Sequence, residues 1–209
     1  FNVMRKAFLL LSVLLMSLCA QAQELANFTR QAAVVSPEII GDTVYFRLNA
    51  SYATTAQVSG NWGGPAIAMT KDFSGIWTAK MKAPEPEIYT YSFIVDGVSV
   101  NDPVNYMVQR DGTRYLNMLN VPGERSENYN ECSQRGTLQY VWYDSKSLGI
   151  NRRVAVYLPY GYEKSSKKYP VLYLLHGGGG DEEAWVSMGR TCQIMDNLIE
   201  KGLAEPMIV

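Results

Sequence analysis

The chain has 209 residues, 47% of them hydrophobic, which is ordinary for a globular protein of one or two domains. Its 19 basic and 20 acidic side chains are spread along the sequence and give a formal net charge of -1. The sequence shows neither a basic stripe nor an acidic tail, so nucleic acid is not an expected partner.

Residues 1–22 have the pattern of a secretory signal peptide. Met4 is followed by two basic residues, an apolar run from Ala7 to Ala20, and an Ala-Gln-Ala cleavage pattern that ends at Ala22. The run is shorter than the roughly 20 residues of a membrane-spanning helix, so no transmembrane anchor is expected after cleavage. Phe1–Val3 precede the expected start and are interpreted as untranslated. The pattern predicts an exported protein, periplasmic or secreted.

The cysteines leave two questions open. Cys19 lies near the end of the apolar run, where a lipid anchor can be attached, but Leu18 is larger than the residue that lipoprotein signals place there. Cleavage after Ala22 is therefore the favoured interpretation. In the mature chain, export permits a disulfide between Cys132 and Cys192, and two free thiols fit the sequence equally well.

The region 28–123 is predicted to be a β-sandwich. Short β-rich runs alternate with Gly, Pro, Asn and Asp at intervals of roughly ten residues, which is typical of this architecture. Gly97 can supply the positive φ of a hairpin turn, and Trp77 is expected to pack in the core. The predicted strands are TVYFRLNA (43–50), TAQVSG (55–60), GIWTAKM (75–81) and IYTYSFIVDG (88–97).

A polar segment at 124–136, flanked by Pro122 and Gly123 and ending at Gly136, is the predicted linker. Beyond it, the pattern predicts the beginning of an α/β domain over 137–209. No further strand follows the last one to cover its edge, so we expect the chain to be the N-terminal part of a longer protein. The predicted elements are strands at 137–145, 152–159, 170–175 and 206–209, and a helix at 185–201.

Four glycines follow His176, the single histidine of the chain, directly after the predicted strand 170–175. Ester hydrolysis develops negative charge on a carbonyl oxygen, and a backbone without Cβ atoms can bring its amides close to that oxygen. Gly177 and Gly178 are thus candidate oxyanion-hole donors. A flexible loop and a phosphate cradle are the alternatives, although the acidic residues 181–183 and the missing Gly-Lys-Ser/Thr disfavour a phosphate.

The stretches VYLPYGY, YPVLYLLHGGGG and MDNLIEKG resemble the opening of the esterase D group of secreted α/β-hydrolases, in particular feruloyl and acetyl-xylan esterases of carbohydrate esterase family 1. The resemblance spans residues 139–209. It implies that His176 supports the glycine loop and that the serine, the acid and the catalytic histidine follow downstream of Met207. The triad is then not present in this chain, which alone is expected to be inactive. Ser187 is expected to be structural, and neither a cofactor nor a metal is implied.

The stretches VSPEIIGDTVYFRLNA, VSGNWGG, IYTYSFIVDGVSVNDPVN and GTRYLNMLNVPG resemble the early-set β-sandwich related to carbohydrate-binding module family 48. The resemblance implies that Trp62 stacks on a sugar ring and that Asn117 bonds its hydroxyls. Ser99 and Ser92 replace a tryptophan and a lysine of the glycogen-binding pattern, so glycogen or starch binding is not expected. A role in shaping the esterase cleft competes with polysaccharide binding.

Taken together, these patterns predict an exported esterase that removes feruloyl or acetyl groups from plant xylan by a Ser-His-Asp mechanism. Its expected partner is a polysaccharide or another esterified carbohydrate. A siderophore esterase is the alternative among enzymes. A non-catalytic glycan-binding protein, with the front sandwich as its working part, is the alternative from another class.

Overall fold

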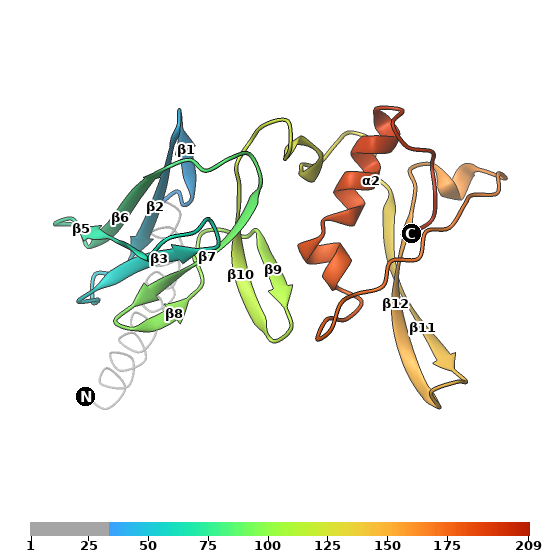
Figure 1. Ribbon diagram of the computed structural model, residues 1–209, viewed down its shortest axis with the longest axis horizontal. Helices are drawn as coiled ribbons and strands as arrows, with labels where there is room; N and C mark the ends of the chain where they lie inside the picture. Colours follow the sequence, from blue (N-terminus) through green and yellow to red (C-terminus); the bar gives the residue numbers. More distant parts are fainter. Residues whose placement is uncertain (1–33) are drawn as a thin grey trace, which may run out of the picture.

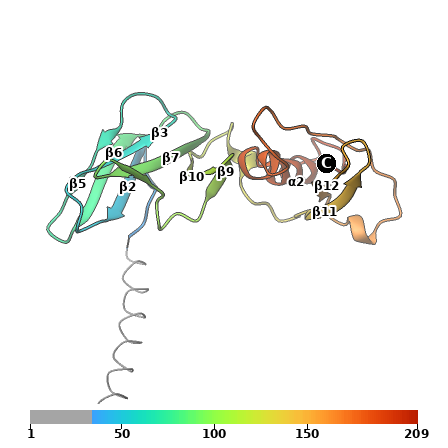
Figure 2. The ribbon, with the colours of Figure 1, turned by 90° about the horizontal axis from the view of Figure 1, so that it is seen from below.

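The computed structural model describes residues 34–209, in two lobes that lie side by side along the long axis of the molecule (Figures 1 and 2). The front lobe holds strands β1 to β10, and the back lobe holds β11, β12 and α2. The predicted signal peptide and Cys19 lie outside the described residues. None of the helices within residues 34–209 is long and apolar enough to cross a membrane.

Two antiparallel sheets make up the front lobe. In the first, the strand order is β1 (Glu38–Ile40), β2 (Thr43–Asn49), β6 (Ile76–Lys82) and β5 (Thr70–Lys71). In the second, it is β4 (Ile67–Ala68), β3 (Ala56–Gly60), β7 (Ile88–Val95), β10 (Arg114–Asn120) and β9 (Val108–Asp111), with β8 (Val98–Val100) paired to β7. The four strands predicted here are confirmed as β2, β3, β6 and β7, with ends that differ by one or two residues.

The two sheets share one hydrophobic core. Alternate residues of β2 point inward, with Val44 and Phe46 fully buried, because successive side chains of a strand face opposite sides. Tyr91 on β7 packs edge-on against Phe46, with ring centroids 5.0 Å apart. Trp77 is 6% exposed and donates its indole N–H to the Ala50 carbonyl at 2.9 Å, which confirms its predicted core position.

The predicted hairpin turn joins β7 to β8 through Asp96 and Gly97, which have φ values of 47° and 85°. Two successive positive φ values match the twist of the flanking strands. The Asp96 carboxylate also accepts the backbone N–H groups of Thr54 and Thr55, at 2.9 and 2.7 Å. These bonds connect the turn to the segment before β3.

The predicted linker is bonded to the back lobe along its length. It contains the short 3-10 helix η1 (Glu127–Tyr129), and the Tyr129 carbonyl accepts a 2.8 Å hydrogen bond from the Arg190 guanidinium. The Asn197 side chain donates to the Asn130 carbonyl at 2.8 Å. Because Arg190 and Asn197 belong to the α2 region, the linker does not act as a free spacer.

The back lobe starts with a long hairpin. β11 (Thr137–Ser145) and β12 (Ile150–Leu158) pair antiparallel from Thr137 opposite Leu158 to Ser145 opposite Ile150. A 3-10 turn, η2 (Tyr162–Lys164), follows. Both strands were predicted, β11 with the same bounds.

The predicted helix 185–201 is shorter than expected. The α-helix α2 spans Thr191–Glu200, and before it lies η3 (Ala184–Met188), a π-helical turn. Arg190 separates them with a φ of 49°. The prediction placed the helix start at Trp185 because this residue fits the apolar spacing. In the structure the Trp185 indole instead donates to the Leu175 carbonyl at 3.0 Å, at the end of the segment 170–175.

The predicted strand 170–175 forms only one β-bridge, a parallel one between Val171 and Ile208. Residues 171–175 are exposed, with Leu175 at 85%, although their apolar composition predicted burial. Among the described residues, the segment also has a neighbouring strand on one side only. A strand with one short partner cannot build a continuous ladder.

Residues 206–209 lie between β12 and the segment 170–172. Val209 exchanges two backbone hydrogen bonds with Tyr157 of β12, at 2.8 and 3.1 Å. On the other side, Leu172 donates to the Ile208 carbonyl at 2.8 Å and Ile208 donates to the Pro170 carbonyl at 3.0 Å. The spatial order is therefore β11, β12, 206–209, 170–172, which departs from the order along the chain.

Candidate functional site

The glycine loop lies at the carboxyl end of the segment 170–175. From there the chain runs through η3 and α2 and returns parallel to its start at 206–209, which is a βαβ connection. Because 206–209 is inserted between β12 and 170–172, the direction in which strands are added reverses at this point. Ligands of open α/β sheets bind at the carboxyl ends of the strands beside such a reversal. The loop thus occupies the position expected for a ligand site.

Residues 177–180 form a tight turn. The Gly180 N–H donates to the Gly177 carbonyl at 3.1 Å, and Gly179 has a φ of 80°. Positive φ at the third position is the requirement of a type II turn and favours glycine. The glycine at 179 is therefore needed for the backbone conformation itself.

The Gly179 amide donates no hydrogen bond among the described residues, and the two predicted donors, the amides of Gly177 and Gly178, are free as well. Within residues 34–209 neither N–H donates a hydrogen bond, and a Cβ at either position would meet no atom within 4 Å. Unpaired amides on an open turn are what an approaching oxyanion needs. The geometry therefore agrees with the predicted donor role, which stays a prediction.

His176 braces the turn at its start. Its Nδ1 lies 2.8 Å from the Gly177 carbonyl oxygen and can donate to it in the tautomer that carries hydrogen on Nδ1. A Cβ on Gly180 would lie 3.3 Å from the same nitrogen, so the ring also covers the end of the turn. The predicted loop-support role fits this position.

The three acidic residues after the loop are paired with arginines. Asp181 forms an ion pair with Arg110 of the front lobe. Arg153 of β12 donates to Glu182 at 2.7 Å and to Glu183 at 3.1 Å. A backbone hydrogen bond and the Arg153 guanidinium hold the pKa of Glu182 below its usual range. The pairing offsets negative charge that would otherwise oppose a developing oxyanion.

Arg153 also connects this acidic segment to the β11–β12 hairpin. Its guanidinium lies over the rings of Tyr140 and Trp142, 4.8 and 5.9 Å from their centroids. Tyr140 donates its hydroxyl to Glu183 at 2.9 Å, and burial together with that carboxylate raises the pKa of Tyr140 to about 12. Sequence reasoning missed Arg110 and Arg153, because both act on residues that are distant in the sequence.

An apolar cavity of about 460 Å³ lies beside the loop. His176 and Trp185 line it near the loop, and Tyr157, Val171 and Val209 line it along the strands.

Within residues 34–209 no three His, Cys, Asp or Glu side chains are grouped as a metal site.

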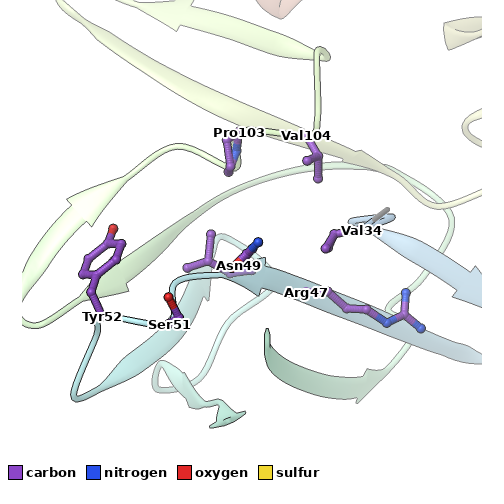
Figure 3. A pocket seen from close by; sticks show the side chains of 8 residues that line it. Val34, Arg47, Asn49, Ser51, Tyr52, Pro103 and Val104 are labelled. Atoms are coloured by element: carbon purple, nitrogen blue, oxygen red, sulfur yellow. The ribbon is translucent and has the colours of Figure 1, made fainter. Parts of the chain in front are cut away.

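A smaller cavity of about 160 Å³ lies in the front lobe, with Tyr52 at one end, Arg47 at the other, and Pro103 and Val104 along one side (Figure 3). The Arg47 guanidinium donates to Glu38 at 2.6 Å and to the Val35 carbonyl at 3.0 Å. Its charge is therefore already paired. The other polar side chains that line this cavity are those of Asn49, Ser51 and Tyr52.

The two predicted sugar-binding residues have internal contacts. Trp62 is half-buried, lies against Gly60, and packs on Phe46 of the core with ring centroids 5.4 Å apart. Asn117 is fully buried, and its side-chain oxygen accepts the Asp102 N–H at 2.7 Å. Its amide nitrogen donates to the Asn105 carbonyl at 2.9 Å. These are the surroundings of structural residues, and sugar binding by either one stays untested.

Ser187 and the cysteines show no sign of a nucleophile. The Ser187 hydroxyl donates to the Glu183 carbonyl at 3.0 Å inside η3, as expected for a structural residue. Cys132 and Cys192 are both free thiols in this structure. Burial and the nearby Asp196 carboxylate raise the pKa of Cys192 to about 11, which disfavours the reactive thiolate.

Comparison with known proteins identifies relatives of both lobes. Residues 145–209 match the family described as "Putative esterase". This C-terminal part of the chain, residues 145–209, is therefore esterase-like. Over 174 residues the chain is 36% identical to an endo-1,4-beta-xylanase/feruloyl esterase of Xylanibacter ruminicola, a match that covers 78% of this chain and 24% of that protein. It is 42% identical over 83 residues to endo-1,4-beta-xylanase Y of Acetivibrio thermocellus, covering 38% of this chain and 7% of that protein.

Among solved structures, the enterobactin esterase FES from Shigella flexneri superposes with a TM-score of 0.58 at 14% identity, over 83% of this chain and 52% of that one. The ferric enterobactin esterase of Salmonella typhimurium gives the same TM-score and identity, over 86% and 56%. At this identity the likeness concerns the fold alone. The chain spans about a quarter or less of the two curated relatives above and about half of these structures.

Proposed function

We propose that the complete protein is an exported serine esterase that hydrolyses feruloyl or acetyl esters on plant xylan. In this proposal the present chain contributes the front lobe and the oxyanion wall of the active site. The observation that carries it is the pair of unpaired amides at Gly177 and Gly178, placed where the strand order reverses. The esterase match over 145–209 and the name of the Xylanibacter relative support the reaction class and the substrate.

The chemistry follows from the loop. A serine oxygen attacks the ester carbonyl carbon, and the carbonyl oxygen takes up negative charge as the tetrahedral intermediate forms. Backbone N–H groups that point at this oxygen stabilise the transition state by about 3 kcal/mol each. Gly177 and Gly178 supply the N–H groups, and His176 keeps the turn in place. The serine, its base and its acid are expected downstream of Met207.

The proposal also includes a fold for each lobe. Two sheets that share one core support an early-set β-sandwich for the front lobe. The order β11, β12, 206–209, 170–172, with a parallel pair connected through α2, supports the beginning of an α/β-hydrolase sheet for the back lobe.

A siderophore esterase is the second candidate. It is favoured by the superposition of enterobactin esterases on 83% and 86% of this chain, a span that includes both lobes. It is disfavoured by the higher identity to a xylanase/feruloyl esterase, 36% against 14%.

The test is a substrate panel with the complete gene product. Methyl ferulate, acetylated xylan and a catechol siderophore ester would be assayed side by side for kcat/KM. We expect turnover of the first or the second with at least a hundredfold preference over the third. Preference for the siderophore would select the second candidate, and the absence of turnover on all three would refute the esterase proposal.

A further inference from the structure

The β9–β10 hairpin of the front lobe reaches the glycine loop of the back lobe. Figure 1 shows this hairpin beside the loop that precedes α2, and β9 packs against η3. The contact involves Arg110, whose guanidinium pairs with Asp181. At the hairpin tip, a Cβ on Gly112 would lie 4.0 Å from the Gly179 carbonyl oxygen.

The loop itself offers few places at which it could be held. Four glycines have no side chains to pack, and glycine loses more conformational freedom on ordering than any other residue. His176 holds the start of the turn. Asp181 holds its end, because its carboxylate accepts the Glu183 N–H at 3.0 Å and its carbonyl accepts the Ala184 N–H at 3.1 Å. Whatever fixes Asp181 therefore fixes the end of the loop.

We propose that Arg110 is a positioning residue for the oxyanion loop: the front lobe holds the amides of Gly177 and Gly178 in place through the Arg110–Asp181 ion pair. This inference rests on the proposed esterase function for its catalytic consequence, but not for its structural one. It gives the front lobe a role in the reaction that does not require sugar binding.

The surroundings of the pair favour this role over that of an ordinary surface pair. Arg110 and Asp181 keep 31% and 42% of their side-chain surface exposed, so both are partly shielded from water. Arg110 also lines a cavity of about 260 Å³ with Tyr115 from the front lobe and Arg153 and Glu183 from the back lobe. Isolated pairs on a surface contribute little, but this pair joins the two lobes at the residue that directly follows the glycine loop, next to the Arg153 pairs of Glu182 and Glu183.

Hydrogen exchange of the full chain tests the structural part. Arg110→Ala should speed exchange of the Gly180 and Ala184 amides about three- to tenfold. Loss of a partly shielded ion pair lowers the free energy of local opening by an amount that corresponds to this change in rate. Arg114→Ala is the matched control, because Arg114 lies in the same hairpin and pairs with Asp111 inside it. Arg110→Lys, which keeps the positive charge opposite Asp181, should retain slow exchange. Equal rates in wild type, Arg110→Ala and Arg114→Ala would overturn the inference.

Steady-state kinetics of the complete gene product test the catalytic part. We expect Arg110→Ala to lower kcat about tenfold and to change KM for a small ester less than twofold, and we expect Arg110→Lys to retain most of the wild-type kcat. An unchanged kcat in an active enzyme would overturn the positioning role. If the wild type proves inactive on esters while exchange still responds to Arg110→Ala, the proposed function fails and the structural inference stands. Arg110→Gln and Asp181→Asn break the pair with little change in volume and replace any variant that does not fold.

Discussion

The Tyr157 hydroxyl donates a 2.6 Å hydrogen bond to the Asp196 carboxylate. Both residues are buried, and the same carboxylate oxygen accepts the Gly136 N–H at 2.8 Å. One carboxylate thus joins β12, α2 and the end of the linker. Burial and the nearby negative charge raise the pKa of Tyr157 well above its usual value, so its hydroxyl stays a donor throughout the physiological range.

Tyr157→Phe removes one of the two donors to Asp196 and leaves a buried carboxylate less well paired. We expect the free energy of unfolding of the full chain to fall by about 1–3 kcal/mol, the usual cost of an unsatisfied buried group. The measurement is urea unfolding monitored by circular dichroism. Tyr143→Phe on β11 is the control, since Tyr143 is 48% exposed. Equal midpoints for the two variants would contradict the structural role of this bond.

Gly178→Pro removes a candidate oxyanion donor with little other change. Residue 178 is the second residue of the turn from Gly177 to Gly180, a position at which proline is favoured. In the complete gene product we expect kcat to fall by about 10²–10³, the loss measured for removal of one such donor.

Gly178→Ala is the matched control for that variant. It keeps the N–H, and the added methyl group meets no atom of this chain within 4 Å, so we expect a smaller loss of kcat than in the proline variant. If the proline variant keeps full activity, the Gly178 amide is not an oxyanion donor, and the Gly177 amide would have to act without it.

Asn117→Ala should destabilise the front lobe. The side chain bonds Asp102, Asn105 and Asn101, so its removal leaves buried backbone groups of the loop 101–105 unpaired. We expect a loss of about 1–3 kcal/mol in the free energy of unfolding. Ser99→Ala, at an exposed position nearby, should change it by less than about 0.5 kcal/mol.

Affinity electrophoresis on xylan separates this expectation from the sugar-binding hypothesis. A variant that keeps its stability but no longer binds xylan would assign Asn117 to a sugar site. The structural role predicts a loss of stability in Asn117→Ala, and the sugar-binding role predicts none.

Cys192 should be slow to alkylate. Its pKa is raised from 9.0 to about 11, so at pH 8 its thiolate population is about one hundredth of that of an ordinary thiol. Mass spectrometry of iodoacetamide labelling in a Cys132→Ser background measures this rate. Labelling as fast as that of a free thiol in peptide form would show that Cys192 is more accessible than the structure indicates.

The raised pKa of Cys192 also makes the stability of the fold depend on pH. A group that binds its proton more tightly in the folded state stabilises the fold fully below its unfolded pKa. For Cys192 this contribution is present below about pH 9 and is lost as the pH rises toward about 11. Cys192→Ala should reduce the loss of stability across this range, which urea titrations at several pH values would detect.

Six of the twelve strands could be predicted from the sequence, because alternation and turn residues are local signals. β2, β6, β7 and β11 follow such patterns, and Asp96-Gly97 has the composition of the turn that it forms. The segment 170–175 could not be predicted correctly, since its burial depends on neighbours that a local pattern does not reveal. The start of α2 was misplaced for a related reason: Trp185 is held by the Leu175 carbonyl and not by the face of the helix.

The sequence by itself determined four strands of the front lobe, the β11–β12 hairpin strands and the bare backbone after His176, because each depends on residues within a few positions of one another. Only the tertiary structure decided that 206–209 inserts beside Tyr157, that Asn117 is buried, and that Arg110 pairs with Asp181. These contacts join residues far apart in the chain. Their formation depends on how whole elements pack, which no short stretch of sequence specifies.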